Sequence, residues 1–358
     1  MSSDPSERLT GLPIQFVSST PQAVPRPPAK ITTEHRRRKR IDHRAERARA
    51  RSSLKVSGRA SGGLQGWILH LAEERTETLL DSSAEQRDLW DRIAAGYSPD
   101  DAVETEAIAG TLDFLQELSG GGTALEFAVG GGRIAVPLYR RGVRVHGMDV
   151  SPGMIDVLHA AVPADELLAT VGSMATDAPP GTDYQLIYIV YNAITCLLHQ
   201  DEQIACFQNA ARHLRPGGHF VIEVWVPQLR QLPPGQTLVP GTATKDRLII
   251  DSYDLVSQRL VSQHYTLKDG KVIDSGGTPH RYVWPSEMDV MAKMAGLELT
   301  NRYADWTRSE FTGDSKSGIS VWTNHPDRGS QTDASASGRW RPSARRSSGN
   351  LTGHPTER

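Results

Sequence analysis

The sequence predicts an α/β protein in which a doubly wound parallel sheet is followed by an antiparallel β extension. Segments of strand type and helix type alternate from Thr123 to Val226, which is typical of a parallel sheet with helices on both faces. Beyond Pro227 the alternation ends, and strand-like segments follow one another, two of them joined by an Asp-Gly turn. This second pattern indicates antiparallel hairpins.

Two helices are expected before the sheet, and a run of three glycines at 120–122 ends the second of them. Ser151 is the expected N-cap of a later helix, because its hydroxyl can accept a backbone N–H in the first turn. The helices are expected at Leu80 to Tyr97, Ala102 to Leu118, Arg133 to Arg141, Pro152 to Ala161 and Glu202 to Leu214. The strands that alternate with them are expected at Thr123 to Ala128, Val143 to Asp149, Leu168 to Val171, Gln185 to Val190 and His219 to Val226.

The antiparallel extension is predicted at about residues 240–284. Its expected strands are Arg247 to Leu255, Arg259 to Leu267 and a segment around Val272, with a turn at Asp269-Gly270. A helix that opens at Pro285 and ends at Gly296 then leads to two last strands. These are expected at Leu297 to Tyr303 and Gly318 to Trp322.

The two ends lie outside the expected domain, which spans residues 80–324. Residues 1–62 are rich in Ser, Pro, Arg and Ala and lack apolar periodicity, so we predict a disordered basic arm. It contains the run Arg36-Arg37-Arg38-Lys39-Arg40, which suits RNA or another anionic surface, although such charge blocks are usually solvated tails. Residues 325–358 have a similar composition and are predicted to form a disordered tail.

The distribution of charge argues against nucleic acid as the ligand of the folded part. The first sixty residues hold 14 Lys and Arg against 5 Asp and Glu, and residues 325–358 hold 6 against 3. Because the net charge of the chain is −2, residues 61–324 carry about −14. An acidic domain repels a phosphate backbone, so nucleic acid is not the expected partner.

Cysteine content and hydropathy set the expected compartment. Cys196 and Cys206 are the two cysteines of the chain, and their spacing matches neither a metal site nor a redox pair. No apolar run approaches the ~20 residues of a membrane span, and the first residues lack the apolar stretch of a secretion signal. We therefore expect a cytoplasmic protein with no metal and no membrane contact.

The central motif is a strand that runs into glycines and then into a helix, Glu126-Phe127-Ala128-Val129-Gly130-Gly131-Gly132-Arg133. Glycines permit a sharp turn at positive φ and let a ligand approach the amides at the helix start. Asp149 lies nineteen residues after Gly130 at the end of the next strand, where its carboxylate can accept both ribose hydroxyls of an adenosine cofactor. Taken alone, the pattern also fits NAD or a purely structural turn.

Glu126 favours S-adenosylmethionine over NAD. It stands near the end of a strand that is otherwise expected to be apolar, and a buried carboxylate needs a partner. In the dinucleotide fold this strand usually runs apolar into its first glycine. A carboxylate here can meet the cationic amino-acid part of S-adenosylmethionine, directly or through water. The alternative is a strand-end Glu paired with a local basic group.

Three segments in the right order resemble the signature segments of class I methyltransferases, which have a Rossmann-like fold: Glu126 to Arg133, Gly147 to Met154 and Leu214 to Gly218. The resemblance covers about residues 85–324. It implies a methyltransferase whose cofactor is S-adenosyl-L-methionine. The residues that it implies for cofactor binding are Tyr97, Glu126, Ala128, Gly130, Gly132, Asp149, Met154, Ser173, Met174, Tyr191 and Asn192.

One position departs from the family pattern. Members often carry an acidic residue beside the adenine, commonly Asp in a Gly-Asp-Met run, and this chain has Ser173 there. A hydroxyl can still bond to the adenine amine, but less strongly than a carboxylate. The departure affects the expected affinity for the cofactor and leaves its identity unchanged.

The expected acceptor is a small molecule with an amine or a hydroxyl. Tyr191 to Thr195 resembles the segment that faces the methyl group in the family, and it lacks the Pro-Pro-aromatic signature of enzymes that methylate amino groups of nucleic-acid bases. Cys196 lacks the Pro-Cys context of cytosine C5 methylation. The extension resembles that of bacterial small-molecule N-methyltransferases, including those that act on amino sugars, in which it covers the site or builds a dimer. A homodimer is therefore expected.

His264 and His280 in the extension are the candidate catalytic residues, because a neutral imidazole can take a proton from the acceptor. For each of them a structural, hydrogen-bonded role is the alternative. Two other functions stay open at this point. One is an RNA-associated methyltransferase that uses the basic arm, and the other is a non-catalytic cofactor-binding protein.

Overall fold

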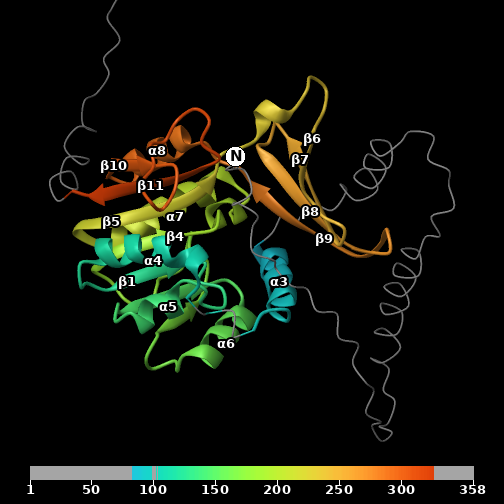
Figure 1. Ribbon diagram of the computed structural model, residues 1–358. Coiled ribbons are helices and arrows are strands. Elements are labelled where there is room, and N and C mark those ends of the chain that lie inside the picture. The colour runs from blue at the N-terminus through green and yellow to red at the C-terminus, as the bar shows by residue number, and fades with distance from the viewer. Residues whose placement is uncertain (1–82, 99–101, 103, 326–358) are drawn as a thin grey trace, which may run out of the picture.

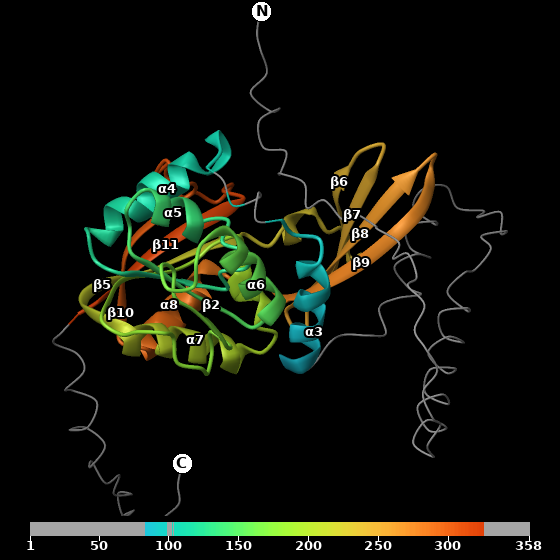
Figure 2. The same ribbon diagram turned by 90° about the horizontal axis from the view of Figure 1, so that it is seen from below.

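The computed structural model describes residues 83–98, 102 and 104–325 (Figure 1). At its centre is a seven-stranded sheet with the strand order β10-β11-β5-β4-β1-β2-β3. A second sheet, β6-β7-β8-β9, projects from it and is called the arm below (Figures 1 and 2). The predicted fold, a doubly wound sheet with an antiparallel extension, is confirmed.

The helices and strands alternate along the first two thirds of the described chain. The helices are α3 (Ser83–Ala94), α4 (Glu106–Ser119), α5 (Ala135–Arg140), α6 (Pro152–Ala161), α7 (Gln200–His213) and α8 (Pro285–Met294), with short 3-10 turns η3 (Ala193–Cys196) and η4 (Leu229–Gln231). The central strands are β1 (Ala124–Phe127), β2 (Val145–Asp149), β3 (Ala169–Val171), β4 (Tyr184–Ile189), β5 (Leu214–Trp225), β10 (Leu297–Tyr303) and β11 (Ser317–Asn324). The arm consists of β6 (Leu238–Ala243), β7 (Arg247–Asp254), β8 (Arg259–Lys268) and β9 (Lys271–Arg281).

Two apolar cores cover the two faces of the central sheet. On one face α4, α5 and α6 bring Leu112, Leu138 and Leu158 into one fully buried cluster. On the other face α7 and α8 contribute Phe207 and Met288, which are equally buried. All six residues of β4 are buried, as expected of a central strand in a sheet that is covered on both faces. The cores thus hold the parallel strand ends at fixed relative positions.

The last two strands do not belong to the arm. β11 pairs antiparallel with β5 over seven residue pairs, from Ser317 with Trp225 to Thr323 with His219, and β10 pairs with β11. This agrees with the prediction, which expected both strands after the extension at about 240–284, but the sequence did not indicate which sheet they join. Their apolar residues complete the central sheet, where Trp322 is fully buried, because β5 would otherwise present an unpaired edge.

Several element boundaries differ from those predicted, and three of these differences have a local backbone reason. Helix α4 begins at Glu106 rather than Ala102, because Thr105 is extended (φ −125, ψ 160). Helix α5 begins at Ala135 rather than Arg133, because Gly132 (φ 86) still belongs to the turn. Strand β5 begins at Leu214, which already pairs with β4 before a register shift.

Strand β6 was not predicted. It contains Pro240 and Gly241, residues that are unfavourable inside a strand. It is tolerated because β6 is the outer strand of the arm and pairs with β7 on one side only. By contrast, the bounds of α6 agree with prediction, and Ser151 caps it by accepting the Met154 N–H at 3.1 Å.

Two predicted segments lie outside the described residues. They are the disordered N-terminal basic arm at 1–62, with its run Arg36 to Arg40, and the disordered tail beyond residue 325. Among the helices of the described ranges, none has both the length and the apolar character needed to cross a membrane.

The first testable prediction concerns packing at Gly132. Gly132 and Gly142 have nearly equal positive φ, 86 and 87, but a Cβ at Gly132 would overlap the Leu158 side chain and lie 2.6 Å from Val136 Cγ2. Nothing lies within 4 Å of a Cβ at Gly142. Gly142→Ala should lower the free energy of unfolding by roughly 1–2 kcal/mol through backbone strain, and Gly132→Ala by a further 1–3 kcal/mol, roughly, through overpacking. Urea unfolding of both variants measures this, and equal losses would contradict the packing.

Candidate active site

The residues predicted to bind the cofactor gather along one edge of the central sheet. Gly130 follows β1, Asp149 ends β2, Ser173 follows β3 and Tyr191 follows β4. These four strands are neighbours in the order β4-β1-β2-β3 and run parallel. Their carboxyl ends therefore meet at the edge where ligands bind in open α/β sheets.

The carboxylate of Asp149 joins two of these strand ends. Its Oδ2 accepts the backbone N–H of Gly130 at 2.9 Å, and its Oδ1 accepts that of Ser151 at 2.9 Å. Burial raises the pKa of Asp149 to about 6, against the opposing effect of the two backbone donors. The glycine turn after β1 and the start of α6 are thus tied to one side chain.

Glu126 is buried inside β1, with 2% of its surface exposed. The Tyr188 hydroxyl on β4 donates to its Oε2 at 3.1 Å, and burial raises the pKa of Glu126 to about 8. The ion pairs found among the described residues do not include Glu126. The local partners of this carboxyl are the Tyr188 hydroxyl and the Ala135 backbone N–H rather than the basic group considered as an alternative.

The glycine turn contains left-handed backbone at three positions: Ala128 (φ 55), Gly130 (φ 53) and Gly132 (φ 86). A non-glycine residue in this region is uncommon, and such strain clusters at ligand sites. Tyr97 reaches the same turn, since a Cβ at Gly131 would lie 3.5 Å from Tyr97 Cδ1. The structure therefore brings Tyr97 to the turn from the chain segment after α3.

Ser173 forms hydrogen bonds within its own turn. Its N–H donates to Asp177 Oδ2 at 2.8 Å, and its hydroxyl oxygen accepts the Ala175 N–H at 3.2 Å. Met174 is buried in the core with α7, and Met154 is buried against α3. Ser173 and Met174 follow β3, whereas Met154 lies in the first turn of α6, and the contact of all three with a cofactor stays a prediction.

The segment after β4 has two consecutive non-glycine residues in the left-handed region, Tyr191 (φ 52) and Asn192 (φ 62). Side-chain hydrogen bonds hold this strained turn. Glu223 Oε2 accepts the Tyr191 N–H at 2.8 Å, and Asn192 Oδ1 accepts the Trp225 N–H at 3.0 Å. The Asn192 amide also donates to Thr195 Oγ1 at 3.1 Å. Because both ends of the Asn192 side chain are occupied, its role in the turn is structural.

Two residues that the sequence analysis did not single out as site residues complete this turn. The Arg133 guanidinium lies over the Tyr191 ring, 4.2 Å from its centre, which is cation–π geometry. Glu223 also accepts the Trp306 indole N–H at 3.2 Å. Arg133 stood in the glycine motif, and Glu223 is a carboxylate in an apolar strand, the same signal that marked Glu126.

His280 lies beside this turn, and its hydrogen bonds define its protonation. Thr195 Oγ1 donates to the Asn192 carbonyl at 2.7 Å and lies 2.9 Å from His280 Nδ1. Since the single hydroxyl proton of Thr195 goes to that carbonyl, His280 Nδ1 must carry the proton that it shares with Thr195. Its Nε2 then accepts from Thr278 Oγ1 at 3.1 Å. Burial, followed by the effect of His264, lowers the pKa of His280 to about 4.

His264 lies farther out on the arm. It pairs with Gly276, four residues before His280 along β9. The Arg247 guanidinium donates to its Nδ1 at 3.0 Å, so the proton of the neutral ring is on Nε2, 3.3 Å from Ser262 Oγ. Burial and the Arg247 charge lower the pKa of His264 to about 4. The structure brings His280 to the turn after β4, and it gives His264 partners on the arm alone.

A buried polar network fixes the base of the arm. Arg281 at the end of β9 forms an ion pair with Glu287 of α8 at 2.8 Å and donates to Gln203 of α7. The Gln203 amide in turn donates to the carbonyls of Ile194 in η3 and of Arg281. The arm is therefore bonded to the same short turn that follows Asn192.

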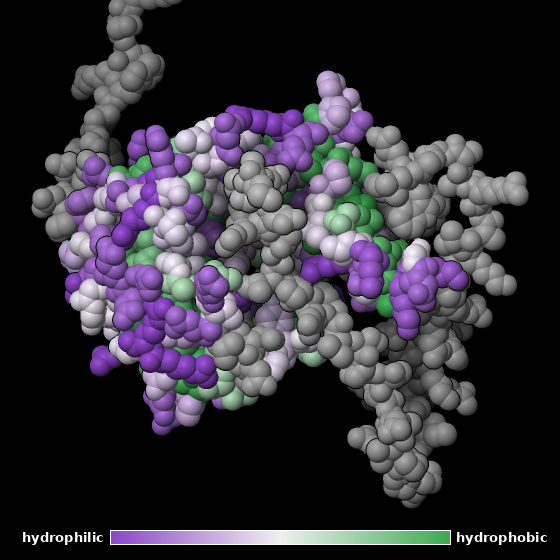
Figure 3. Space-filling view, in the orientation of Figure 1, coloured by the Kyte–Doolittle hydropathy of each residue, from purple (hydrophilic) through white to green (hydrophobic). Residues whose placement is uncertain are grey.

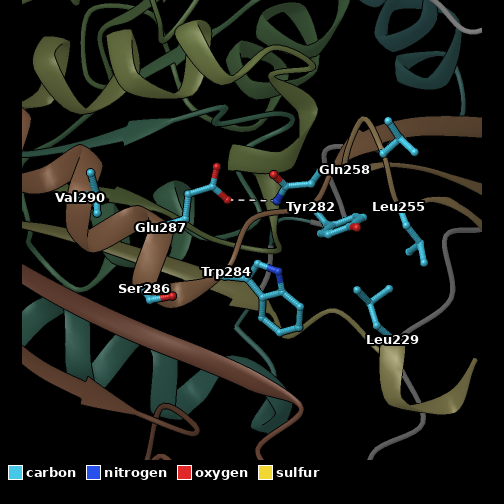
Figure 4. Close-up of a pocket in the computed structure, with 9 residues that line it drawn as sticks. Leu229, Leu255, Gln258, Tyr282, Trp284, Ser286, Glu287 and Val290 are labelled. Atoms are coloured by element: carbon cyan, nitrogen blue, oxygen red, sulfur yellow. Dashed lines mark hydrogen bonds between the residues drawn. The ribbon is translucent and has the colours of Figure 1, made fainter. Parts of the chain in front are cut away.

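A groove of about 770 Å³ lies beside this network (Figure 4). In the close-up Tyr282 and Trp284 lie between Leu229 and Glu287, and Gln258 donates to Glu287. The groove is lined by Leu229, Leu255, Val256, Gln258, Tyr282, Trp284, Ser286, Glu287 and Val290. It contains neither the glycine turn nor Asp149, so it is separate from the strand ends described above.

The second prediction follows from the burial of Glu126. Because its folded-state pKa (about 8) lies above the ordinary value of 4.5, the folded protein keeps a proton that the unfolded chain loses, and stability falls as the pH rises through that interval. Glu126→Gln removes this dependence. The free energy of unfolding of the variant minus that of the wild type should therefore be larger at pH 8 than at pH 6. Urea unfolding at both pH values measures this difference. A difference that does not change with pH would contradict a buried, protonated Glu126.

Comparison with known proteins agrees with this geometry. Residues 124–218 match the family described as a methyltransferase domain. The solved structure of the CcbJ methyltransferase from Streptomyces caelestis is 32% identical, with a TM-score of 0.55, and the match covers 67% of this chain and 96% of that chain. The cypemycin N-terminal methyltransferase from a Streptomyces species is 24% identical over 199 residues, which are 55% of this chain and 80% of that protein.

A third similar protein is the amino pentose methyltransferase CalS10 from Micromonospora echinaspora, solved with S-adenosylmethionine bound. It is 18% identical, with a TM-score of 0.47, over 69% of this chain and 99% of that chain. The match to CcbJ spans nearly all of a relative that is more than 30% identical. The chain therefore belongs to the class I methyltransferases, enzymes that depend on S-adenosyl-L-methionine, and the dinucleotide alternative is excluded.

Proposed function

We propose that this enzyme transfers the methyl group of S-adenosylmethionine to an amine of a small-molecule acceptor, bound between the turn after β4 and the arm. The observation that carries the proposal is the state of His280. This ring is neutral, lies next to the turn after β4 through Thr195, and is a weak base with a pKa of about 4. An acceptor that needs no strong base suits such a site.

The two candidate acceptors place different demands on the protein. A neutral amine attacks the methyl carbon with its own lone pair and can lose its proton to water after the transfer. A hydroxyl is a poor nucleophile until a base removes its proton, and general-base catalysis is most effective when the base has a pKa near the working pH. Both His264 and His280 have pKa values near 4, which supports the amine.

The residues at the strand ends fit the parts of the cofactor, whose sulfonium supplies an activated methyl group. Asp149, which accepts two backbone N–H groups, would also accept hydrogen bonds from the ribose hydroxyls. Glu126, buried without an ion pair among the described residues, suits the cationic amino-acid part, and Ser173 suits the adenine edge. Holding the acceptor against the methyl group and excluding water are the main tasks left to the protein.

The name of one relative, cypemycin N-terminal methyltransferase, gives an N-terminus as its target, which also supports an amine as the acceptor. The expected homodimer and cytoplasmic location stay predictions. Exposed apolar side chains on the arm, such as Val256 and Ile273, support a protein contact there, and Figure 3 shows hydrophobic residues gathered along the arm.

A second candidate function is methylation of an RNA held by the basic run Arg36 to Arg40. The run itself is the observation in its favour. Deleting residues 1–60 tests it, because phosphate contacts by this segment would make RNA retention depend on it and on salt. Unchanged activity and unchanged RNA retention would exclude this candidate.

The third prediction tests the ribose site. Asp149→Ala should weaken binding of S-adenosylmethionine by roughly 1–3 kcal/mol, the scale of hydrogen bonds to a charged group. Isothermal titration calorimetry measures this, with Asp165→Ala as the control, since Asp165 is an exposed acid after α6. Equal affinity of the Asp149 variant and the wild type would show that the ribose binds elsewhere.

The fourth prediction separates two roles of His280. Asn can donate to Thr195 in place of Nδ1–H, so His280→Asn should keep kcat within about threefold, whereas His280→Phe should lower kcat about tenfold, the scale of one lost hydrogen bond. The pH dependence of kcat/KM should be the same in His280→Asn and the wild type. A loss of 10²–10⁴-fold in His280→Asn, the usual contribution of a general base, together with a changed pH profile, would instead identify His280 as the base.

A further inference from the structure

Asp91 of α3 contacts the start of α6 through a single oxygen. Its Oδ1 accepts the Ser151 hydroxyl at 2.5 Å and the Gly153 N–H at 3.1 Å. Gly153 lies in the first turn of α6, where backbone N–H groups lack partners within the helix. Helix α3 lies beside α6 in both ribbon views (Figures 1 and 2). One carboxylate thus connects a helix before the sheet to the segment that follows β2.

Ser151 connects Asp91 to Asp149, the proposed ribose site. It is fully buried, its hydroxyl proton goes to Asp91, and its oxygen accepts the Met154 N–H at 3.1 Å. Its own backbone N–H donates to Asp149 Oδ1 at 2.9 Å. Since Asp149 also holds the Gly130 N–H, a continuous chain of hydrogen bonds runs from α3 to the glycine turn.

The apolar attachment of α3 is small and tightly fitted. The buried cluster consists of Ile93, Ala94 and Met154, with partly buried neighbours that include Tyr97. A Cβ at Gly153 would lie 3.2 Å from Ala94 Cβ and 3.3 Å from Asp91 Oδ1, so a side chain at this position would press on the contact. The partly buried Leu89 and Trp90 complete this apolar cluster, and the hydrogen bonds of Asp91 are a polar contact of α3 beside it.

We propose that Asp91 is a positioning residue for the cofactor, which couples the docking of α3 on α6 to the binding of the ribose at Asp149. The inference rests on the ribose site proposed above. When α3 is docked, Ser151 is held so that its N–H fixes the orientation of the Asp149 carboxylate, and Tyr97 is held at the glycine turn. Coupling of this kind is reciprocal, so bound cofactor must also stabilise the docked position of α3.

The test compares four proteins by titration with S-adenosylhomocysteine. Asp91→Ala removes the acceptor and should weaken binding about tenfold, the scale of one hydrogen bond to a charged group. Asp91→Asn keeps an oxygen in the place of Oδ1 and should bind within about threefold of the wild type. Asp88→Ala is the matched control, because Asp88 is an exposed acid of the same helix, and it should bind as the wild type does.

Hydrogen exchange gives a readout that a purely structural role of Asp91 would not move. S-adenosylhomocysteine should slow exchange of the α3 amides in the wild type and in Asp91→Asn, and should have little effect on them in Asp91→Ala. Ser151→Ala removes the other partner of the same bond. The loss of affinity in the double variant should be smaller than the sum of the two single losses, because both substitutions remove the hydrogen bond between Ser151 and Asp91.

Two results would overturn the proposal: wild-type affinity in Asp91→Ala, or equal weakening in Asp91→Asn and Asp91→Ala, which would assign the effect to charge. If Asp91→Ala does not fold, Asp91→Asn and the exchange of α3 amides in the wild type still decide the question. Asp149→Ala is titrated in parallel. Normal binding by that variant refutes the ribose site itself, whereas weak binding by it with normal binding by Asp91→Ala refutes the role of Asp91 alone.

Discussion

The hydrogen bonds from Gly130 N–H and Ser151 N–H to Asp149 are the interaction on which the site depends. They link the turn after β1 to the turn after β2 through a carboxylate that is almost fully buried. Moving this carboxylate would release both turns, and with them the left-handed backbone at Gly130. Neighbouring strands of a parallel sheet cannot be joined by a short hairpin. Here the turns after β1 and β2 are instead joined by a side chain.

The turn after β4 follows the same principle with different groups. Tyr191 and Asn192 are strained, and their conformation persists because Glu223, Trp225 and Thr195 bond to them. Strain of this size is stable only where the surroundings over-determine it. The arm adds to these constraints, since His280 reaches Thr195 and Arg281 bonds to Gln203 beneath η3. The turn proposed to face the methyl group is therefore held by the central sheet and by the arm together.

Features with a local cause could be predicted from the sequence, and those with a long-range cause could not. The cap at Ser151 and the bounds of α6 follow from neighbouring residues, and the glycine turn follows from its own composition. The position of β11 in the central sheet depends on pairing with β5, about a hundred residues earlier, and no local pattern indicates such a contact. Likewise, nothing local shows that Asp91 reaches Ser151 or that His280 reaches Thr195. Glu126 and Glu223 fall between these two cases. The sequence shows a carboxylate in an apolar strand, but it does not show the residue to which that carboxylate bonds.

We propose that the carboxyl edge of β1, β2, β3 and β4 holds S-adenosylmethionine with its methyl group towards the arm. A crystal structure of the enzyme with S-adenosylhomocysteine would test this. We expect ribose hydroxyls within hydrogen-bond distance of Asp149 and a sulfur atom that faces the turn at Tyr191 and Asn192. A nucleoside bound in the groove at Trp284, or a sulfur that faces away from this turn, would contradict it.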